Sequence, residues 1–186
     1  MLVGEIQQTT IMIGIFKPGS QPIQQYHYKS AFSGGLIVDK DKATEFYELA
    51  NEYCRFIVGN EITADSVSHL MELLMKLYFS AMYLPEAEPE TIDSSLVPLE
   101  SVQIRLSNHI SPVYWEVFDP YVEEEPVCGD LTDDFSDIAG NLRNGMKEYE
   151  AGRVGNAVFE WKLSFNSHWG QHVVDALRAL HAVRCR

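Results

Sequence analysis

Two histidines four positions apart, His168 and His172, are the residues whose types and spacing most directly indicate chemistry in this sequence. Residues four apart lie one helical turn from each other, so both imidazoles can reach one metal ion. The motif reads HWGQH, which lacks the glutamate that serves as the base in the HExxH motif of zinc proteases. Asp175 follows three residues later and is the candidate for orienting one imidazole by accepting the ring N–H that does not face the metal. The spacing predicts a metal or acid–base site without the zinc-protease base.

The two histidines belong to a long stretch, residues 154–186, in which apolar side chains recur at steps of three and four. This period predicts one amphipathic helix with a single buried face. At about 100° per residue, His172 falls in the middle of that face and His168 falls at its edge. The apolar face consists of Val154, Val158, Trp161, Phe165, Trp169, Ala176, Leu180 and Val183.

The preceding stretch, residues 131–150, predicts a second amphipathic helix. Asp130 is its expected N-cap, because a short acidic side chain can accept from the free N–H groups of the first turn. Gly152 suits the position just after its last turn, where the backbone commonly turns left-handed. The short connection predicts that residues 131–150 and 154–186 form a tight antiparallel helical hairpin.

This hairpin would bring two acidic side chains to the two histidines. Residues about fifteen positions before and after the turn lie level with each other, because both helices rise equally per residue. Asp137 then lies level with His168, and Asp134 lies level with His172. The candidate metal ligands are therefore His168, His172, Asp134 and Asp137. The same pattern also has a structural interpretation, in which His172 is a core histidine that hydrogen-bonds an aspartate of the neighbouring helix.

An aromatic segment, YWEVFDP at residues 114–120, has no clear period and predicts a loop or single turn pinned into the core. If this loop covers the histidine pocket, Glu116 and Asp119 can add ligands. Asp119 can instead cap a turn with Pro120. The candidate pocket-lining residues are Trp115, Glu116, Asp119 and Trp169.

Apolar periodicity elsewhere predicts that the fold is all-α, an antiparallel bundle of about five helices that ends in the C-terminal hairpin. Thr63 is the expected N-cap of the second helix, and a solvated connector rich in proline and acidic residues follows it at residues 85–98. The expected helices span residues 41–58, 64–84, 99–109, 131–150 and 154–186.

The first 38 residues differ from the rest. Ile11, Ile13 and Ile15 alternate as in a strand, but Lys17-Pro18-Gly19-Ser20 breaks the pattern. We predict a poorly ordered or short-strand arm over residues 1–38, or an over-long start-codon assignment, followed by one helical domain over residues 39–186. The alternative is a strand in the arm that pairs with another copy of the chain.

The formal net charge of -13 disfavours nucleic-acid phosphates and anionic membranes as partners, because both attract basic surfaces. It favours a basic protein partner or a bound cation. The hydrophobic fraction of 46% in 186 residues suffices for one folded core.

The three cysteines show no CxxC spacing, which argues against a disulfide framework or a cysteine zinc site and favours a reducing cytoplasm. No apolar run approaches the roughly 18 residues that span a bilayer, and no secretory signal is evident. The cysteines are Cys54, Cys128 and Cys185.

Residues 114–120 and the run WKLSFNSHWGQHVVDALRALHAVR at residues 161–184 resemble a family of small bacterial helical proteins described as a domain of unknown function. The resemblance covers about residues 39–186. It implies an all-helical fold and supplies no activity, substrate or partner.

Two functional hypotheses follow. In the first, the protein is a small acidic cytosolic module that binds another protein, as an adaptor, inhibitor or immunity factor, and needs no cofactor. In the second, it is an enzyme in which His168, His172, Asp134 and Asp137 hold a divalent metal that activates water, while Asp175 orients a histidine. The sequence leaves open which hypothesis holds, which residues are catalytic and what the oligomeric state is.

Overall fold

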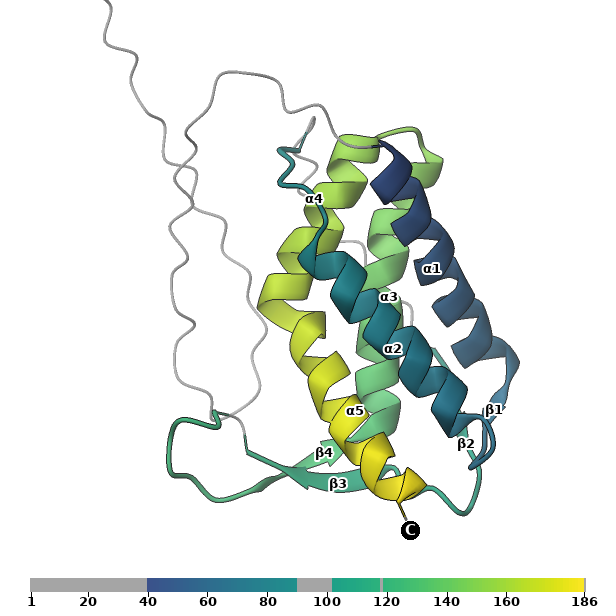
Figure 1. The fold of residues 1–186 in the computed structure, drawn as a ribbon, viewed down its shortest axis with the longest axis vertical. Coiled ribbons are helices and arrows are strands. Elements are labelled where there is room, and N and C mark those ends of the chain that lie inside the picture. The colour runs from purple at the N-terminus through teal and green to yellow at the C-terminus, as the bar shows by residue number, and fades with distance from the viewer. Residues whose placement is uncertain (1–39, 90–101, 118, 186) are drawn as a thin grey trace, which may run out of the picture. The chain divides into compact units, whose positions relative to one another are not determined.

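The computed structural model describes residues 40–89, 102–117 and 119–185, which form a bundle of helices with a β-hairpin at one end (Figure 1). The predicted arm at residues 1–38 and the connector from residue 90 onward lie outside this described part of the chain. In chain order the elements are α1 (Lys40–Gly59), β1 (Glu61–Ile62), α2 (Val67–Met82), β2 (Arg105–Leu106), β3 (Val113–Glu116), β4 (Val127–Asp130), α3 (Leu131–Glu150), α4 (Val154–Ser164), the π-helix η1 (Phe165–Trp169) and α5 (Gly170–Arg184).

The predicted helical hairpin is present, with both predicted end signals. The Asp130 carboxylate accepts the backbone N–H of Thr132 at 2.7 Å and so caps α3. After α3, Gly152 takes a φ of 80°, a left-handed conformation that glycine adopts without steric cost. The N–H of Arg153 bonds the Glu148 carbonyl at 3.0 Å, which closes the last turn. The chain then reverses into α4.

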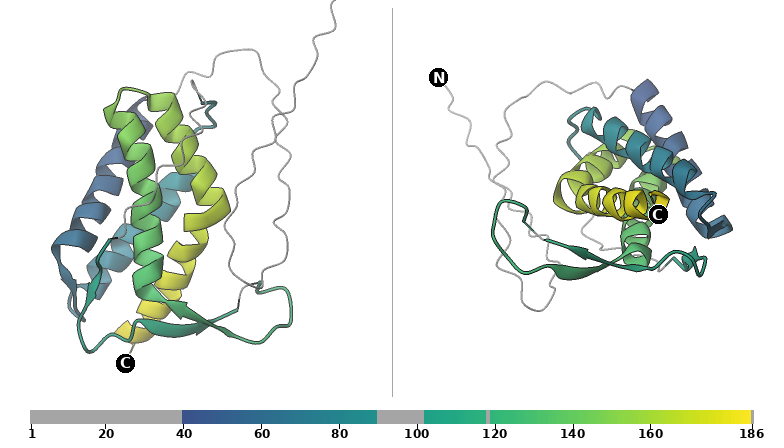
Figure 2. Two further views of the ribbon diagram at one scale, coloured as in Figure 1. Left: turned by 180° about the vertical axis from the view of Figure 1, so that it is seen from behind. Right: turned by 60° about the horizontal axis from the view of Figure 1, so that its bottom comes forward.

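The core lies where α3 packs against α1, α4 and α5, while α2 packs against α1 and α5 (Figure 2). Large aromatic side chains fill it, and their polar atoms are satisfied. The Tyr53 hydroxyl donates to the Phe135 carbonyl at 3.2 Å, and the Trp161 indole N–H donates to the Leu142 carbonyl at 3.0 Å. These contacts confirm the predicted helical bundle. The largest fully buried side chains include Phe46, Tyr53, Phe135, Trp161 and Trp169.

The C-terminal helix is not a uniform α-helix as predicted. A π-turn, η1, separates α4 from α5, and the Gly170 N–H reaches back to the Phe165 carbonyl, five residues earlier. A Cβ on residue 170 would lie 2.5 Å from that carbonyl oxygen, so only glycine fits where the π-turn closes. The wide turn places His168 within η1 and His172 within the first turn of α5.

The predicted helix at residues 99–109 is wrong over its described part. Residues 105–106 form β2, which pairs in parallel with β1, and the Ser107 N–H bonds the Ile62 carbonyl at 2.9 Å. Val102, Ile104 and Leu106 alternate with exposed residues, which is the period of a strand. This alternation was visible in the sequence and competed with the helical spacing on which the prediction relied.

The start of the second helix also differs from the prediction. α2 begins at Val67, and residues 64–66 form a turn in which Thr63 supplies a backbone carbonyl to Ser66 and Val67. Thr63 is therefore not the N-cap. Its N–H instead bonds the hydroxyl of Ser66 at 2.9 Å.

The first part of the aromatic segment, residues 114–116, belongs to a strand and not to a loop in the core. β3 pairs antiparallel with β4, and Tyr114 lies opposite Gly129 while Trp115 lies opposite Cys128. Side chains alternate across the strand, so Tyr114 is partly buried while Trp115 is 67% exposed. The hairpin lies at the end of the bundle where α3 begins and α5 ends (Figures 1 and 2).

The outer face of α2 carries exposed apolar side chains, including Met75 and Met82. Only Met71 of the three methionines on this helix is buried. Within the described ranges, the length and apolar character of every helix fall short of what crossing a lipid bilayer requires.

Candidate metal centre

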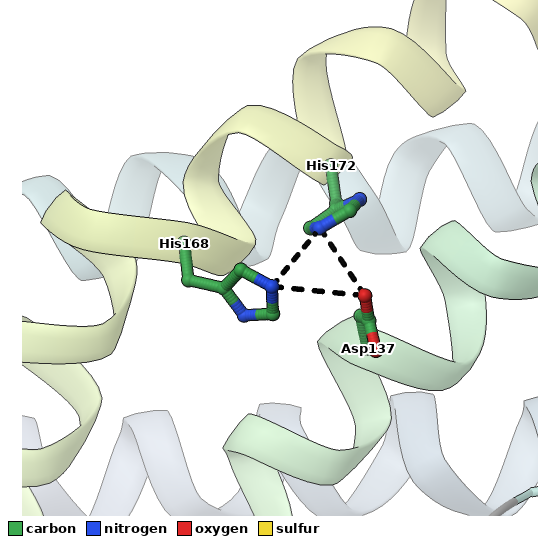
Figure 3. A group of neighbouring side chains, drawn as sticks. All are labelled: Asp137, His168 and His172. Atoms are coloured by element: carbon green, nitrogen blue, oxygen red, sulfur yellow. Dashed lines mark hydrogen bonds and ion pairs between the residues drawn. The ribbon is translucent and has the colours of Figure 1, made fainter. Parts of the chain in front are cut away.

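Three side chains from the helical hairpin converge as the sequence predicts (Figure 3). Nε2 of His172 lies 3.2 Å from Nε2 of His168 and 3.3 Å from Oδ2 of Asp137. Nε2 of His168 lies 3.6 Å from the same oxygen. The three side chains are partly buried, so solvent reaches part of each of them.

The triangle has the size that a transition metal needs. Ligands at ~2.0–2.1 Å from a tetrahedral zinc ion lie ~3.3–3.4 Å apart. The three observed edges of 3.2, 3.3 and 3.6 Å bracket that value. His168, His172 and Asp137 would therefore be spaced to hold such an ion. Three protein ligands leave a coordination position open, which is the arrangement of catalytic rather than structural zinc sites.

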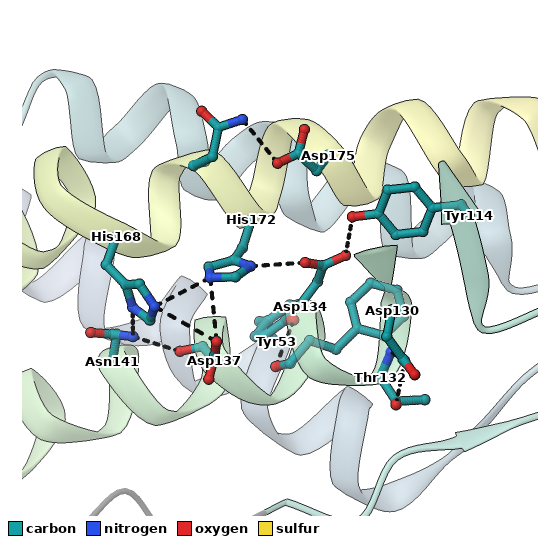
Figure 4. Close-up of polar contacts among 12 residues, drawn as sticks. Tyr53, Tyr114, Asp130, Thr132, Asp134, Asp137, Asn141, His168, His172 and Asp175 are labelled. Atoms are coloured by element: carbon teal, nitrogen blue, oxygen red, sulfur yellow. Dashed lines mark hydrogen bonds and ion pairs between the residues drawn. The ribbon is translucent and has the colours of Figure 1, made fainter. Parts of the chain in front are cut away.

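Asp134 contacts Nδ1 of His172, whereas the triangle with His168 and Asp137 is formed by Nε2 of His172. Its Oδ1 lies 2.8 Å from Nδ1 of His172, and its Oδ2 accepts the hydroxyl of Tyr114 at 2.7 Å (Figure 4). This nearly buried carboxylate fixes the imidazole so that Nε2 faces Asp137. Burial lowers the pKa of His172, but the hydrogen bond and charge of Asp134 outweigh it, and the pKa is raised. We had expected Asp134 to be a ligand, whereas its position is that of an orienting partner.

Asn141 plays the corresponding part for His168, and the sequence prediction missed it. Its Nδ2 donates to the Asp137 carbonyl at 2.7 Å and lies 2.9 Å from Nδ1 of His168. The signal was available, because Asn141 lies one turn after Asp137 on the same polar stripe of α3. An amide that donates to Nδ1 leaves the hydrogen of a neutral imidazole on Nε2. Without metal, His168 can therefore donate to His172, which in turn donates to Asp134.

The remaining predicted site residues lie elsewhere. Asp175 accepts from Gln171 of its own helix at 2.9 Å, and the histidines are oriented by Asp134 and Asn141 instead. Burial, the largest cause, and the charge of Asp134 raise the pKa of Asp175. It therefore lies within electrostatic reach of the centre.

Among the described residues, neither Glu116 nor Asp119 joins the group formed by Asp137, His168 and His172. Trp169 is fully buried in the core, Trp115 is exposed on β3, and Glu116 is partly buried on the same strand. Asp119 accepts the Tyr121 N–H at 2.9 Å, so it caps a turn, which was the alternative interpretation. The residue of this segment that reaches the centre is Tyr114, which we had not singled out.

Comparison with known proteins identifies relatives of the fold. The sequence profile of one family, described as a domain of unknown function (DUF5063), matches residues 38–186. A crystal structure of protein BF1032 from Bacteroides fragilis, a structural genomics target, superposes with a TM-score of 0.59 at 21% sequence identity. The match covers 78% of this chain and 93% of that chain, and it shows a shared fold. No curated protein matches the chain.

Proposed function

The chain belongs to the family of the domain of unknown function DUF5063, and from its side chains we propose that the domain binds one divalent transition-metal ion between α3 and α5 and uses it to activate water. The observation that carries the proposal is the triangle formed by His168, His172 and Asp137. In the metal-free domain a second side chain also holds the other ring nitrogen of each histidine. His172 faces the Asp134 carboxylate with its Nδ1, as metal-ligating histidines that donate their other ring N–H commonly do.

The donor set favours a particular class of ion. Two imidazoles and one carboxylate suit zinc and other first-row divalent metals, whereas magnesium and calcium prefer sites made of oxygen. The chain carries a formal net charge of -13, which raises the local concentration of cations. The open position can hold a water molecule, whose pKa a bound zinc ion lowers to about 7. The chemistry supported is metal-assisted attack by hydroxide.

The backbone at the site supports the same proposal. π-turns are rare, cost stability and recur at functional sites. Here η1 contains His168 and ends at Trp169, between the two histidines of the HWGQH motif. A regular α-helix over the same residues would avoid the cost of the π-turn. A requirement for the position of His168 accounts for the presence of the π-turn.

Metal titration of the purified domain tests the proposal. After treatment with chelator, titration with Zn²⁺ or Co²⁺ should show one ion per chain, and Co²⁺ should give a visible absorption band. His168→Ala and Asp137→Ala should each weaken binding strongly. Asp133→Ala is the matched control, because it removes the same charge from an exposed position on the same helix. Failure of the wild type to bind either ion, or equal affinity in all three variants, would refute the proposal.

A second candidate function, binding to a basic protein, is favoured by the exposed outer face of α2. Met75, Phe79, Met82 and Tyr83 are each about half exposed or more, at 52%, 62%, 49% and 59%. A cluster of large apolar side chains on an acidic chain fits a partner with a basic, partly apolar surface. Retention of such a partner should be lost in Phe79→Ser and kept in His168→Ala. Equal retention by wild type and Phe79→Ser would contradict this function.

Both proposals are compatible with the cytoplasm. The three cysteines are free, and Cys128 and Cys185 are exposed. Exposed thiols persist in reducing compartments, which supports a cytoplasmic location.

A further inference from the structure

We infer that Tyr114, on the β3–β4 hairpin, is a positioning residue for the metal ligand His172, an inference that rests on the proposed metal site. The connection runs through one carboxylate. The Tyr114 hydroxyl donates to Oδ2 of Asp134 at 2.7 Å, and Oδ1 of Asp134 bonds Nδ1 of His172 at 2.8 Å. The imidazole is therefore held from a strand that lies outside the helical hairpin (Figure 4).

Asp134 needs both partners to keep its orientation. The residue is 5% exposed, so little water is available to replace a lost hydrogen bond. With Oδ2 fixed by Tyr114, Oδ1 faces the imidazole, and the carboxylate cannot turn freely about its Cβ–Cγ bond. Burial first, and then the hydrogen bond to Asp134, raise the pKa of Tyr114, so its hydroxyl remains a donor at neutral pH.

The hairpin is built to hold Tyr114 in place. Gly129 lies opposite Tyr114 in the strand register, and a Cβ on residue 129 would lie 2.5 Å from the ring. The ring therefore lies directly against the backbone of β4, in a space that only glycine leaves open. A side chain at residue 129 would push the hydroxyl away from Asp134.

The hairpin is also joined to both helices that supply ligands. β4 leads directly into α3, and the Leu131 N–H bonds the Pro112 carbonyl at 2.8 Å. On the other side, the Arg178 guanidinium of α5 donates to the Trp115 carbonyl, next to Tyr114. The strand that carries Tyr114 is thus fixed relative to Asp137 on α3 and His172 on α5. This rigidity is what a positioning residue requires.

Tyr114→Phe tests the inference, because it keeps the ring against Gly129 and removes only the hydroxyl. Loss of a partner that orients a metal-ligating histidine typically weakens metal binding about 10–100-fold. We expect the Co²⁺ dissociation constant of Tyr114→Phe to rise at least about tenfold, with a changed visible spectrum of the bound ion. Tyr121→Phe is the matched control, since Tyr121 is 96% exposed in the loop of the same hairpin. Its affinity and spectrum should equal those of the wild type.

Gly129→Ala provides a second variant, and it should weaken Co²⁺ binding in the same direction. All titrations are made well below the melting temperature, so that a purely structural role would lower the melting temperature and leave the affinity of the folded protein unchanged. Unchanged affinity and spectrum in Tyr114→Phe, together with loss of the ion in His168→Ala, would overturn the inference and leave the metal site standing. A wild-type protein that binds neither Co²⁺ nor Zn²⁺ would overturn both.

Discussion

Replacing His172 by alanine should destabilise the metal-free domain by about 2 kcal/mol, within a range of roughly 1–3 kcal/mol. The substitution removes the bond from Nδ1 to the nearly buried Asp134 at 2.8 Å. A hydrogen bond to a charged group contributes roughly 1.5–3 kcal/mol. The contacts of Nε2 with His168 and Asp137, at 3.2 and 3.3 Å, are longer and more exposed and should add little.

His172→Gln separates the hydrogen bond from the imidazole. The glutamine amide can donate to Asp134, so stability should recover in part, but an amide is a poor metal ligand and bound Co²⁺ should be lost in both variants. The control is His181→Ala, which removes an exposed histidine from the same helix and should change stability by less than about 0.5 kcal/mol.

Urea denaturation at neutral pH with a chelator present measures these differences. A loss of 2 kcal/mol corresponds to a fall in melting temperature of about 4–8 °C for a chain of this length. A loss below about 0.5 kcal/mol for His172→Ala would refute the reasoning, because it would mean that Asp134 does not depend on the imidazole. Equal stability of the alanine and glutamine variants would refute the part assigned to the hydrogen bond.

Three further predictions concern the core, Asn141 as the partner of His168, and the thiols. Trp161→Ala should cost roughly 3–5 kcal/mol in chemical denaturation, because it empties a fully buried site and leaves the Leu142 carbonyl without its indole donor; a loss under about 1 kcal/mol would contradict the packing. Asn141→Asp should tighten Co²⁺ binding roughly tenfold in titration. Ligation through Nε2 leaves the hydrogen of His168 on Nδ1, where a carboxylate accepts it and the Nδ2 group of Asn141 cannot, so weaker binding would count against the site. A thiol reagent at pH 8 should modify the two exposed cysteines rapidly and Cys54 only after unfolding, because burial raises the pKa of the Cys54 thiol to about 11. Rapid labelling of all three cysteines would show that α1 opens readily.

The convergence of the site was predictable because it is local in sequence. Asp134 lies on α3, and His172 lies on α5, which continues α4 through η1. One short turn joins the two arms of this hairpin, and the left-handed Gly152 fixes where that turn falls. Helical periodicity then determines which residues lie level across the hairpin. Periodicity alone was not sufficient at residues 102–109, because the apolar residues there fit both a strand and a helix. Pairing with β1 determined that residues 105–106 form a strand.

The sequence by itself determined the C-terminal helical hairpin, its end signals at Asp130 and Gly152, and the meeting of two carboxylates with two histidines, because these depend on periodicity and a short connection. Only the tertiary structure decided which atoms face the triangle, since that depends on side-chain conformations set by partners such as Asn141. It also determined the role of Tyr114, whose hydroxyl reaches Asp134 only when β3 pairs with β4 and the ring lies against Gly129. Strand pairing joins segments whose own sequences do not reveal their partner, and a π-turn is stabilised by packing that no local pattern encodes.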